Sequence, residues 1–226
     1  MTIHTSTDDL IATLATKGYA VLNQAILADL TMQLRNQACA LQKNGVMRRA
    51  TTGKNSTDEN READTTSSLR GDFTYWLENT DNNSSSESIT YKNITAAYLQ
   101  HMETLRLLLN QTLFLGLFDF ETHFAIYPAG AGYSKHLDRF HQSATFQKGT
   151  TPAENTQRKI SVILYLNKDW QAQDGGQLRL YLNDTQHIDI EPLGGRMVVF
   201  LSDQFWHEVL PAKRERISLT GWFRTR

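Results

Sequence analysis

The sequence has few of the features that mark secreted, membrane-bound or nucleic-acid-binding proteins. It contains one cysteine, Cys39, so no disulfide can form within the chain, as fits a reducing cytoplasm. The formal net charge of -1 gives no general attraction for nucleic acid or for an anionic membrane. No stretch approaches the ~18 consecutive apolar residues of a membrane span, and residues 1–10 lack the apolar segment of a signal peptide. We therefore expect a cytoplasmic protein with no nucleic-acid or membrane partner.

The sequence does have enough apolar material for a core. Of its 226 residues, 40% are hydrophobic and 21% are charged, which allows a sizeable core in one domain, or in one domain with an appended lobe. We expect a single domain over residues 1–226. Apolar residues at spacings of three and four predict helices over residues 8–17, 27–44 and 89–113. These helices fall within residues 1–115, which we expect to be mainly a helical support.

Two polar stretches interrupt this pattern. Residues 48–71 are rich in Thr, Ser, Asn and Asp, so they cannot bury enough apolar surface to offset the entropy of ordering. We expect a mobile loop there, which is either a solvated connector or a lid over a substrate. Residues 139–157 form a second polar insertion, which we also expect to be a loop.

After Gly116 apolar residues recur at every second position, instead of at every third or fourth position as in a helix. This alternation predicts about eight short strands, at residues 118–127, 133–140, 158–166, 177–182, 187–190, 196–201, 207–210 and 217–223. Glycine-containing turns such as residues 174–176 and 193–195 separate the strands. The pattern favours an α+β fold with a double-stranded β-helix (jelly-roll) core in residues 116–226, buttressed by the N-terminal helices.

His136 and Asp138 are separated by one residue in one of these strands. In an extended segment, alternation places both side chains on the same face, where their metal-binding atoms converge. A jelly roll brings an early and a late strand together, so His207 can complete a set of two histidines and one carboxylate. That set is typical of non-haem Fe(II) oxygenases. A His-x-Asp pair alone also arises by chance, as surface or hydrogen-bonded residues.

Arg216 is the candidate for holding a cosubstrate at such a site. Iron sites of this type often use 2-oxoglutarate, whose second carboxylate needs a cation, and a guanidinium can hold a carboxylate with two parallel hydrogen bonds. Arg216 follows His207 by nine positions. The nearby Lys213, Arg214 and Arg224 fit solvated surface charges better. Both imidazoles must be neutral to bind metal, so we expect binding to fail as the pH falls through the histidine range near ~6.5.

A series of motifs resembles the Fe(II)- and 2-oxoglutarate-dependent prolyl hydroxylases. In chain order these motifs are LRGD at 69–72, FAIYP at 124–128, HLD at 136–138, ILYLNKDW at 163–170, GGQLR at 175–179, DIEP at 189–192, HEV at 207–209 and RISLTGW at 216–222. The resemblance is strong from about residue 118 to residue 223. Within the family, the chain is most similar to the oxygen-sensing, hypoxia-inducible-factor prolyl hydroxylases and their bacterial relatives. The YLNKDW block is much more specific than HLD.

The resemblance implies three groups of site residues. The metal ligands are His136, Asp138 and His207. The residues that bind 2-oxoglutarate are Arg216, Tyr127, Tyr165, Thr220 and Trp222. The residues on the substrate side are Arg158, Arg70 and Trp76. For Tyr127, Thr220 and Trp222, plain packing inside the barrel is an equal alternative.

The same resemblance implies the reaction and its partners. Fe(II), 2-oxoglutarate and O2 would be the cofactors, with ascorbate as a reductant, and succinate and CO2 would be released. The substrate would be a proline in a flexible loop of a cytoplasmic protein, converted to 4-hydroxyproline. By analogy with bacterial relatives, that protein could be elongation factor Tu. Two alternatives stay open: the same chemistry on a free amino acid or other small molecule, and a cupin-like binding module without turnover.

The chain also departs from the family pattern. Residues 139–157 form a longer segment than in the animal enzymes, and the turn before His207 differs, so the family's peptide selectivity does not transfer. One cysteine cannot build a zinc finger. Residues 48–71 occupy the place of the family's substrate-covering loop, which favours the lid over the connector.

Overall fold

The computed structural model of the protein describes residues 7–50, 70–77, 86–138 and 156–226. The helices are α1 (Thr7–Lys17), α2 (Ala28–Lys43) and α3 (Ser86–Leu113), with one short 3-10 helix, η1 (Ala172–Asp174). The strands are β1 (Tyr19–Leu22), β2 (Arg48–Arg49), β3 (Phe73–Trp76), β4 (Asp119–Tyr127), β5 (Tyr133–His136), β6 (Gln157–Tyr165), β7 (Leu178–Tyr181), β8 (His187–Ile190), β9 (Met197–Leu201), β10 (His207–Val209) and β11 (Arg216–Thr225).

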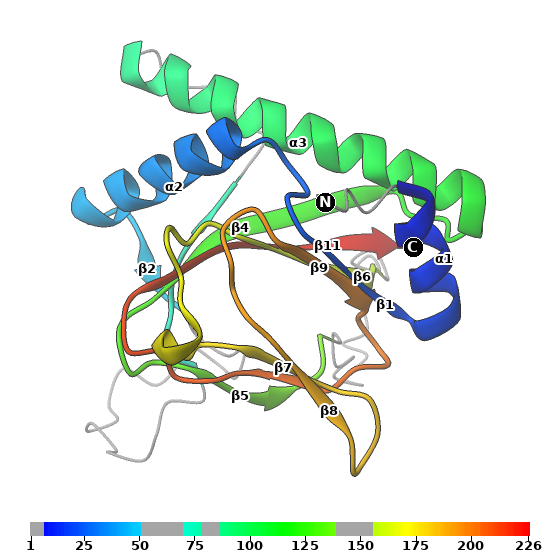
Figure 1. The fold of residues 1–226 in the computed structure, drawn as a ribbon. Helices are drawn as coiled ribbons and strands as arrows, with labels where there is room; N and C mark the ends of the chain where they lie inside the picture. Colours follow the sequence, from blue (N-terminus) through cyan, green and yellow to red (C-terminus); the bar gives the residue numbers. More distant parts are fainter. Residues whose placement is uncertain (1–6, 51–69, 78–85, 139–155) are drawn as a thin grey trace, which may run out of the picture.

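Two antiparallel sheets face each other and form the body of the protein (Figure 1). The larger sheet has the strand order β1-β9-β6-β11-β4-β3-β2, and the smaller has the order β5-β10-β7-β8. Figure 1 shows α2 and α3 lying across the outer side of the larger sheet, away from the smaller one. This arrangement confirms the predicted α+β class with a double-stranded β-helix core supported by helices.

Apolar helix faces cover the larger sheet. Leu34 of α2 and Tyr98, Met102 and Leu109 of α3 are fully buried, and they belong to the same core cluster as Phe124 of β4. Because Tyr98, Met102 and Leu109 are spaced by four and seven residues, they lie on one side of α3. The predicted helices over 8–17, 27–44 and 89–113 are confirmed.

No helix in the described ranges is long and apolar enough to cross a membrane.

The strands of the larger sheet are buried on both faces. Along β4, Phe124 and Ile126 pack against the helices, whereas Ala125 and Tyr127 belong to a second apolar cluster between the two sheets. Successive side chains of a strand point to opposite faces, so a strand covered on both sides reads as a continuous apolar run. The cluster that faces the helices stabilises the fold. The other face of the larger sheet, which points toward the smaller sheet, can therefore carry the residues of the site.

The N-terminal part of the chain also contributes strands. β1 pairs with β9, β3 pairs with β4, and β2 pairs with β3, so all three extend the larger sheet. The expectation of a loop over the whole of 48–71 is therefore wrong at its ends: Arg48 and Arg49 form β2, and Arg70 bridges to Tyr133. These end residues are polar but remain hydrogen-bonded through their backbone, which composition cannot reveal. Residues 51–69, where the lid was expected, lie outside the described ranges.

One predicted strand is shorter than the pattern suggested. The strand expected at 133–140 ends at His136, because its partner β10 is only three residues long and its register shifts between His207 and Val209. Asp138 therefore lies two residues beyond the strand, in irregular backbone. Most of the insertion expected at 139–157 falls in residues 139–155, outside the described ranges.

Candidate metal centre

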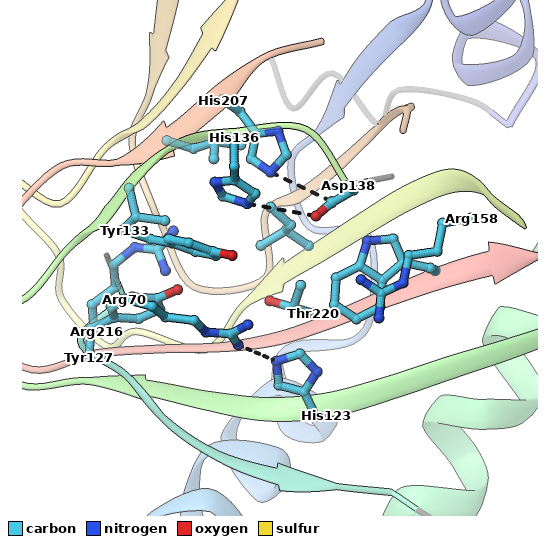
Figure 2. Close-up of a pocket in the computed structure, with 14 residues that line it drawn as sticks. Arg70, His123, Tyr127, Tyr133, His136, Asp138, Arg158, His207, Arg216 and Thr220 are labelled. Carbon is cyan, nitrogen blue, oxygen red and sulfur yellow. Dashed lines mark hydrogen bonds and ion pairs between the residues drawn. The ribbon is translucent and has the colours of Figure 1, made fainter. Parts of the chain in front are cut away.

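Three side chains converge on one point between the two sheets, as Figure 2 shows. His136 is the last residue of β5 and His207 is the first of β10, and the two are paired directly in the antiparallel ladder. Asp138 reaches the same place from the segment that follows β5. One ligand atom from each residue lies within 4.8 Å of the others. The three residues predicted from the sequence are therefore brought together.

The separations fit a single metal ion. The Nε2 atom of His136 is 3.7 Å from Oδ1 of Asp138, and Nε2 of His207 is 3.6 Å from Oδ2 of the same carboxylate. Nitrogen and oxygen ligands lie about 2.0–2.2 Å from a first-row metal, so one ion can bridge these gaps. The set of two imidazoles and one carboxylate leaves other coordination positions open, as Fe(II) oxygenase sites require.

Local backbone contacts fix which imidazole nitrogen faces the ion. Nδ1 of His136 is 2.8 Å from the carbonyl oxygen of Ser134, and Nδ1 of His207 is 3.0 Å from that of Phe205. A carbonyl can only accept, so each Nδ1 carries the hydrogen and donates it. In the neutral ring this leaves the Nε2 lone pair free for the metal. Both ligands use the same contact, to the carbonyl two residues earlier in the chain.

Burial and neighbouring groups together keep His136 and Asp138 in the forms that bind metal. Burial and the neighbouring His207 lower the pKa of His136 to about 4. Its ring thus stays neutral at pH values well below ~6.5, the ordinary pKa of a histidine. Burial acts to raise the pKa of Asp138, but His207, His136, Trp222 and Ser161 together bring it below its ordinary value. A neutral imidazole therefore faces an ionised carboxylate.

Arg216 lines the same pocket, and Tyr165 lies just behind it. The Arg216 side chain is 2% exposed; its Nε donates to the carbonyl of Gly176 at 2.9 Å. Its Nη2 and the hydroxyl of Tyr165 are buried without a hydrogen-bond partner among the described residues. Burial raises the pKa of Tyr165, against the effect of Arg216, so its hydroxyl keeps the proton and can donate. Buried donors of this kind fit the carboxylate of a bound anion.

A glycine accepts the hydrogen bond of this arginine. Gly176 has a φ of +70°, and a Cβ there would lie 2.8 Å from the Cβ of Ala212. A side chain at this position would clash with Ala212 and would strain a backbone that other residues rarely adopt. The glycine of the GGQLR motif therefore preserves the turn whose carbonyl accepts from Nε of Arg216.

Nine of the eleven predicted site residues line the pocket: Arg70, Tyr127, His136, Asp138, Arg158, His207, Arg216, Thr220 and Trp222. Tyr165 lies behind it, with its ring centroid 5.0 Å from the Arg216 guanidinium carbon. Trp76 is 43% exposed and does not line the pocket; it packs against the rings of His123 and Trp222 at 4.6 and 6.2 Å. The structure therefore assembles the predicted set, with Trp76 at its margin.

His123 lines the pocket and was not predicted from the sequence. It lies on β4 two residues before Ala125 and four before Tyr127. Alternate residues of a strand share a face, so the prediction that Tyr127 faces the pocket could have been extended to His123. Its Nε2 lies 3.3 Å from Nη2 of Arg70, as Figure 2 shows, so the ring nitrogen accepts. Burial, together with the nearby cations Arg70 and Arg158, lowers the pKa of His123 to about 3. The ring is neutral at physiological pH.

The arginines at the mouth of the pocket are paired with carboxylates. Arg70 makes two hydrogen bonds to Asp72, at 2.6 and 2.9 Å. Arg158 donates to Glu121 at 2.7 Å, and its guanidinium carbon lies 3.5 Å from the ring centroid of Trp222. The positive charges of Arg70 and Arg158 are therefore already balanced by carboxylates, and Trp222 adds an aromatic surface beside Arg158.

The comparison with known proteins agrees with this site. The model of the 2OG-Fe(II) oxygenase superfamily matches residues 122–224. A prolyl-4-hydroxylase from Pseudomonas putida of known structure is 39% identical, with a TM-score of 0.75 over 97% of this chain and 98% of that one. The hypoxia-inducible factor prolyl hydroxylase of Caenorhabditis elegans is 39% identical, and human Egl nine homolog 1 is 37% identical, each over 103 residues. These residues are 44% of this chain but only 12% and 21% of those two relatives.

We expect the substitution Asp138→Ala to reduce succinate formation from 2-oxoglutarate by at least about 100-fold, because it removes the only carboxylate of the ligand set. Coupled succinate detection measures this directly. Asp189→Ala is the matched control, because Asp189 is on the outer face of the smaller sheet, paired with Arg179. Near wild-type succinate formation by Asp138→Ala would refute the ligand assignment.

Replacing Arg216 by lysine keeps the charge but removes the planar fork that holds a carboxylate. Losing one hydrogen bond to a charged group costs about 1.5–3 kcal/mol, so the KM for 2-oxoglutarate should rise about 10- to 100-fold with a smaller change in kcat. Arg214→Lys is the control, because Arg214 lies on the surface against Asp174. An unchanged KM for Arg216→Lys would exclude Arg216 from cosubstrate binding.

The lowered pKa of His123 predicts a pH dependence of stability. Because the unfolded state binds a proton near pH 6.5 and the folded state only near 3, this residue's contribution is complete above pH 6.5 and is lost as the pH falls. Between pH 7 and pH 5 the loss is about 2 kcal/mol. We expect urea unfolding of His123→Gln to show a pH dependence smaller by that amount. An identical pH dependence in both proteins would show that folding does not lower the pKa of His123.

Proposed function

The chain belongs to the 2OG-Fe(II) oxygenase superfamily, among its prolyl 4-hydroxylases, and on that basis we propose that it hydroxylates a prolyl residue of a protein substrate. In this reaction proline becomes 4-hydroxyproline, 2-oxoglutarate is converted to succinate and CO2, and the site of action is the cytoplasm. Fe(II), 2-oxoglutarate and O2 are the cofactors of the family, and ascorbate would serve as a reductant that keeps the iron as Fe(II).

The observation that carries the proposal is the pairing of two incomplete sites in one pocket. His136, Asp138 and His207 direct ligand atoms at a common point. In the same interior, Nη2 of Arg216 and the Tyr165 hydroxyl have no hydrogen-bond partner within the described part of the chain. A non-catalytic binding module would need one such feature and has no use for both. A metal with an anionic chelating cosubstrate satisfies the two together.

The protein's own residues have binding and orienting roles. Arg216, with the hydroxyl of Tyr165, would hold the distal carboxylate of 2-oxoglutarate, which directs its oxo acid end toward the histidines and Asp138. Tyr127 would flank the cosubstrate, since its ring centroid lies 5.3 Å from the Arg216 guanidinium carbon. When bound, the iron, 2-oxoglutarate and O2 supply the oxidising power that inserts one oxygen atom into a substrate C–H bond.

The walls of the pocket suit a saturated ring. The ring of Tyr133 stacks on His136 with centroids 3.7 Å apart, and Trp222 stacks on His123 at 5.5 Å. Aromatic faces and the apolar side chains of Ile163 and Val209 favour an apolar pyrrolidine over a charged side chain.

The substrate side would recognise shape more than charge. Arg70 and Arg158 are already paired with Asp72 and Glu121, so they need no acidic partner in the substrate. We propose that these arginines, with Trp76 at the margin, contact the backbone and apolar surface of a loop that carries the target proline. The resemblance to bacterial prolyl hydroxylases makes elongation factor Tu the first protein to test.

We expect mass spectrometry to find a proline that gains one oxygen atom when purified elongation factor Tu, or a lysate from cells lacking the gene, is incubated with the protein, Fe(II), 2-oxoglutarate and ascorbate. The Asp138→Ala protein serves as the inactive control. A lysate proline modified in a different protein would replace the candidate partner while keeping the activity. Succinate formation coupled only to oxidation of a free amino acid would contradict protein prolyl hydroxylation.

A further inference from the structure

A buried chain of hydroxyl groups ends on the carboxylate of the metal site. The Oγ atom of Ser161, on β6, lies 2.8 Å from Oδ2 of Asp138, and the Oγ atom of Ser202, just after β9, lies 2.8 Å from Oγ of Ser161. Ser161 and Ser202 have no exposed surface, and Asp138 is 7% exposed. Neither serine lines the pocket, so the chain approaches the carboxylate from behind the site.

The hydrogen bonds of this chain can run in only one direction. An ionised carboxylate has no hydrogen to give, so Ser161 donates its single hydroxyl hydrogen to Asp138. Ser161 must then accept at its own oxygen, which makes Ser202 the donor to Ser161. Each hydroxyl is polarised toward the carboxylate, and hydrogen bonds aligned in this way strengthen one another.

The backbone of the larger sheet holds both hydroxyls in place. Ser161 is paired with Phe200 in the β6–β9 ladder, and the backbone N–H of Ser202 donates to the carbonyl of Lys159 at 3.1 Å. Ser202 therefore stays beside β6 although it lies one residue beyond the end of β9. Asp138, in contrast, lies in irregular backbone after β5, outside the ladders of both sheets.

We propose that Ser161 and Ser202 are positioning residues that commit Oδ2 of Asp138 to the hydroxyl chain and leave Oδ1 as the oxygen that binds the metal. The proposal rests on the metal-binding half of the proposed function and is independent of the substrate. Oδ1 lies 3.7 Å from Nε2 of His136 and Oδ2 lies 3.6 Å from Nε2 of His207, so the two oxygens are equally close to the imidazoles. The hydrogen bond from Ser161 to Oδ2 is what distinguishes them.

The chemical reason is that a carboxylate can bind a metal through one oxygen or through both. Binding through both would occupy a coordination position that a chelating cosubstrate or O2 requires. A charge-assisted hydrogen bond to one oxygen opposes that second mode, and it also fixes the rotation of the carboxylate. The hydroxyl chain would therefore set how many positions of the metal stay open.

A purely structural role is the alternative, in which the two hydroxyls only satisfy each other inside the sheet. Binding of Mn(II) alone, followed by electron paramagnetic resonance without 2-oxoglutarate or substrate, separates the two roles. The variants are Ser161→Ala, Ser202→Ala, the double variant and Ser161→Thr, which keeps a hydroxyl. Thr122→Val is the matched control: its buried hydroxyl donates to the backbone of Thr220 at 3.0 Å, and it is not among the residues that line the pocket.

We expect Ser161→Ala to weaken Mn(II) binding about 10- to 100-fold, and Ser202→Ala to weaken it by a smaller factor. Because Ser202 acts only through Ser161, the double variant should bind Mn(II) as Ser161→Ala does. Ser161→Thr and Thr122→Val should bind as wild type, and thermal unfolding of the metal-free variants checks that all are folded.

Equal Mn(II) affinity in wild type and folded Ser161→Ala would overturn the proposal, as would additive effects of the two alanine substitutions. Those outcomes leave the metal site itself intact. A wild-type protein that binds no Mn(II) and no Fe(II) would instead overturn the proposed function. The two failures are therefore distinguishable in the same titration.

Discussion

The hydrogen-bond ladders on both sides of β11 are the constraint on which the site depends. This strand pairs with β4 from Arg216 to Arg224 and with β6 from Ser218 to Thr225, so it is fixed along its whole length. Because a strand alternates its side chains, Ile217 and Leu219 face the helices while Arg216 and Thr220 face the pocket. A shift of one residue in either ladder would bury the arginine among the helices. The same register that stabilises the core therefore places Arg216 in the pocket, where we propose that it binds 2-oxoglutarate.

The smaller sheet holds the metal ligands by a much weaker framework. β5 and β10 are short, their pairing shifts register after His207, and Asp138 lies beyond the end of its strand. Three contacts compensate for this: the carbonyls of Ser134 and Phe205 orient the two imidazoles, and Ser161 reaches across from the larger sheet to the carboxylate. The metal site is thus built on one sheet and oriented partly by the other.

Nη2 of Arg216 and the Tyr165 hydroxyl have no hydrogen-bond partner among the described residues, which has an energetic consequence. A buried donor without a partner costs about 1–3 kcal/mol. If the carboxylate of 2-oxoglutarate binds there, as proposed, it would relieve this cost and stabilise the folded state by mass action. Function and stability would then oppose each other at this point, as is common in preorganised sites.

The sequence was sufficient for the features that repeat along the chain. Helical spacing identified α1, α2 and α3, alternation located the later strands, and the motif HLD with His207 and Arg216 identified the site. It was insufficient where tertiary pairing decides the outcome. β2 is two residues long and polar, and Ser161 looks like any small residue of a buried strand. Its role depends on Asp138, 23 positions away, and on Ser202, 41 positions away. His123 is the intermediate case, since the strand period alone could have placed it in the pocket.

The most direct test of a joint metal and cosubstrate site is an anaerobic absorption titration of the wild-type protein with Fe(II) and then 2-oxoglutarate. A 2-oxo acid that chelates Fe(II) gives a weak visible metal-to-ligand charge-transfer band. We expect this band to develop in proportion to the protein and to be absent when either Fe(II) or 2-oxoglutarate is left out. No band at saturating Fe(II) and 2-oxoglutarate would mean that His136, Asp138, His207 and Arg216 do not form the site described here.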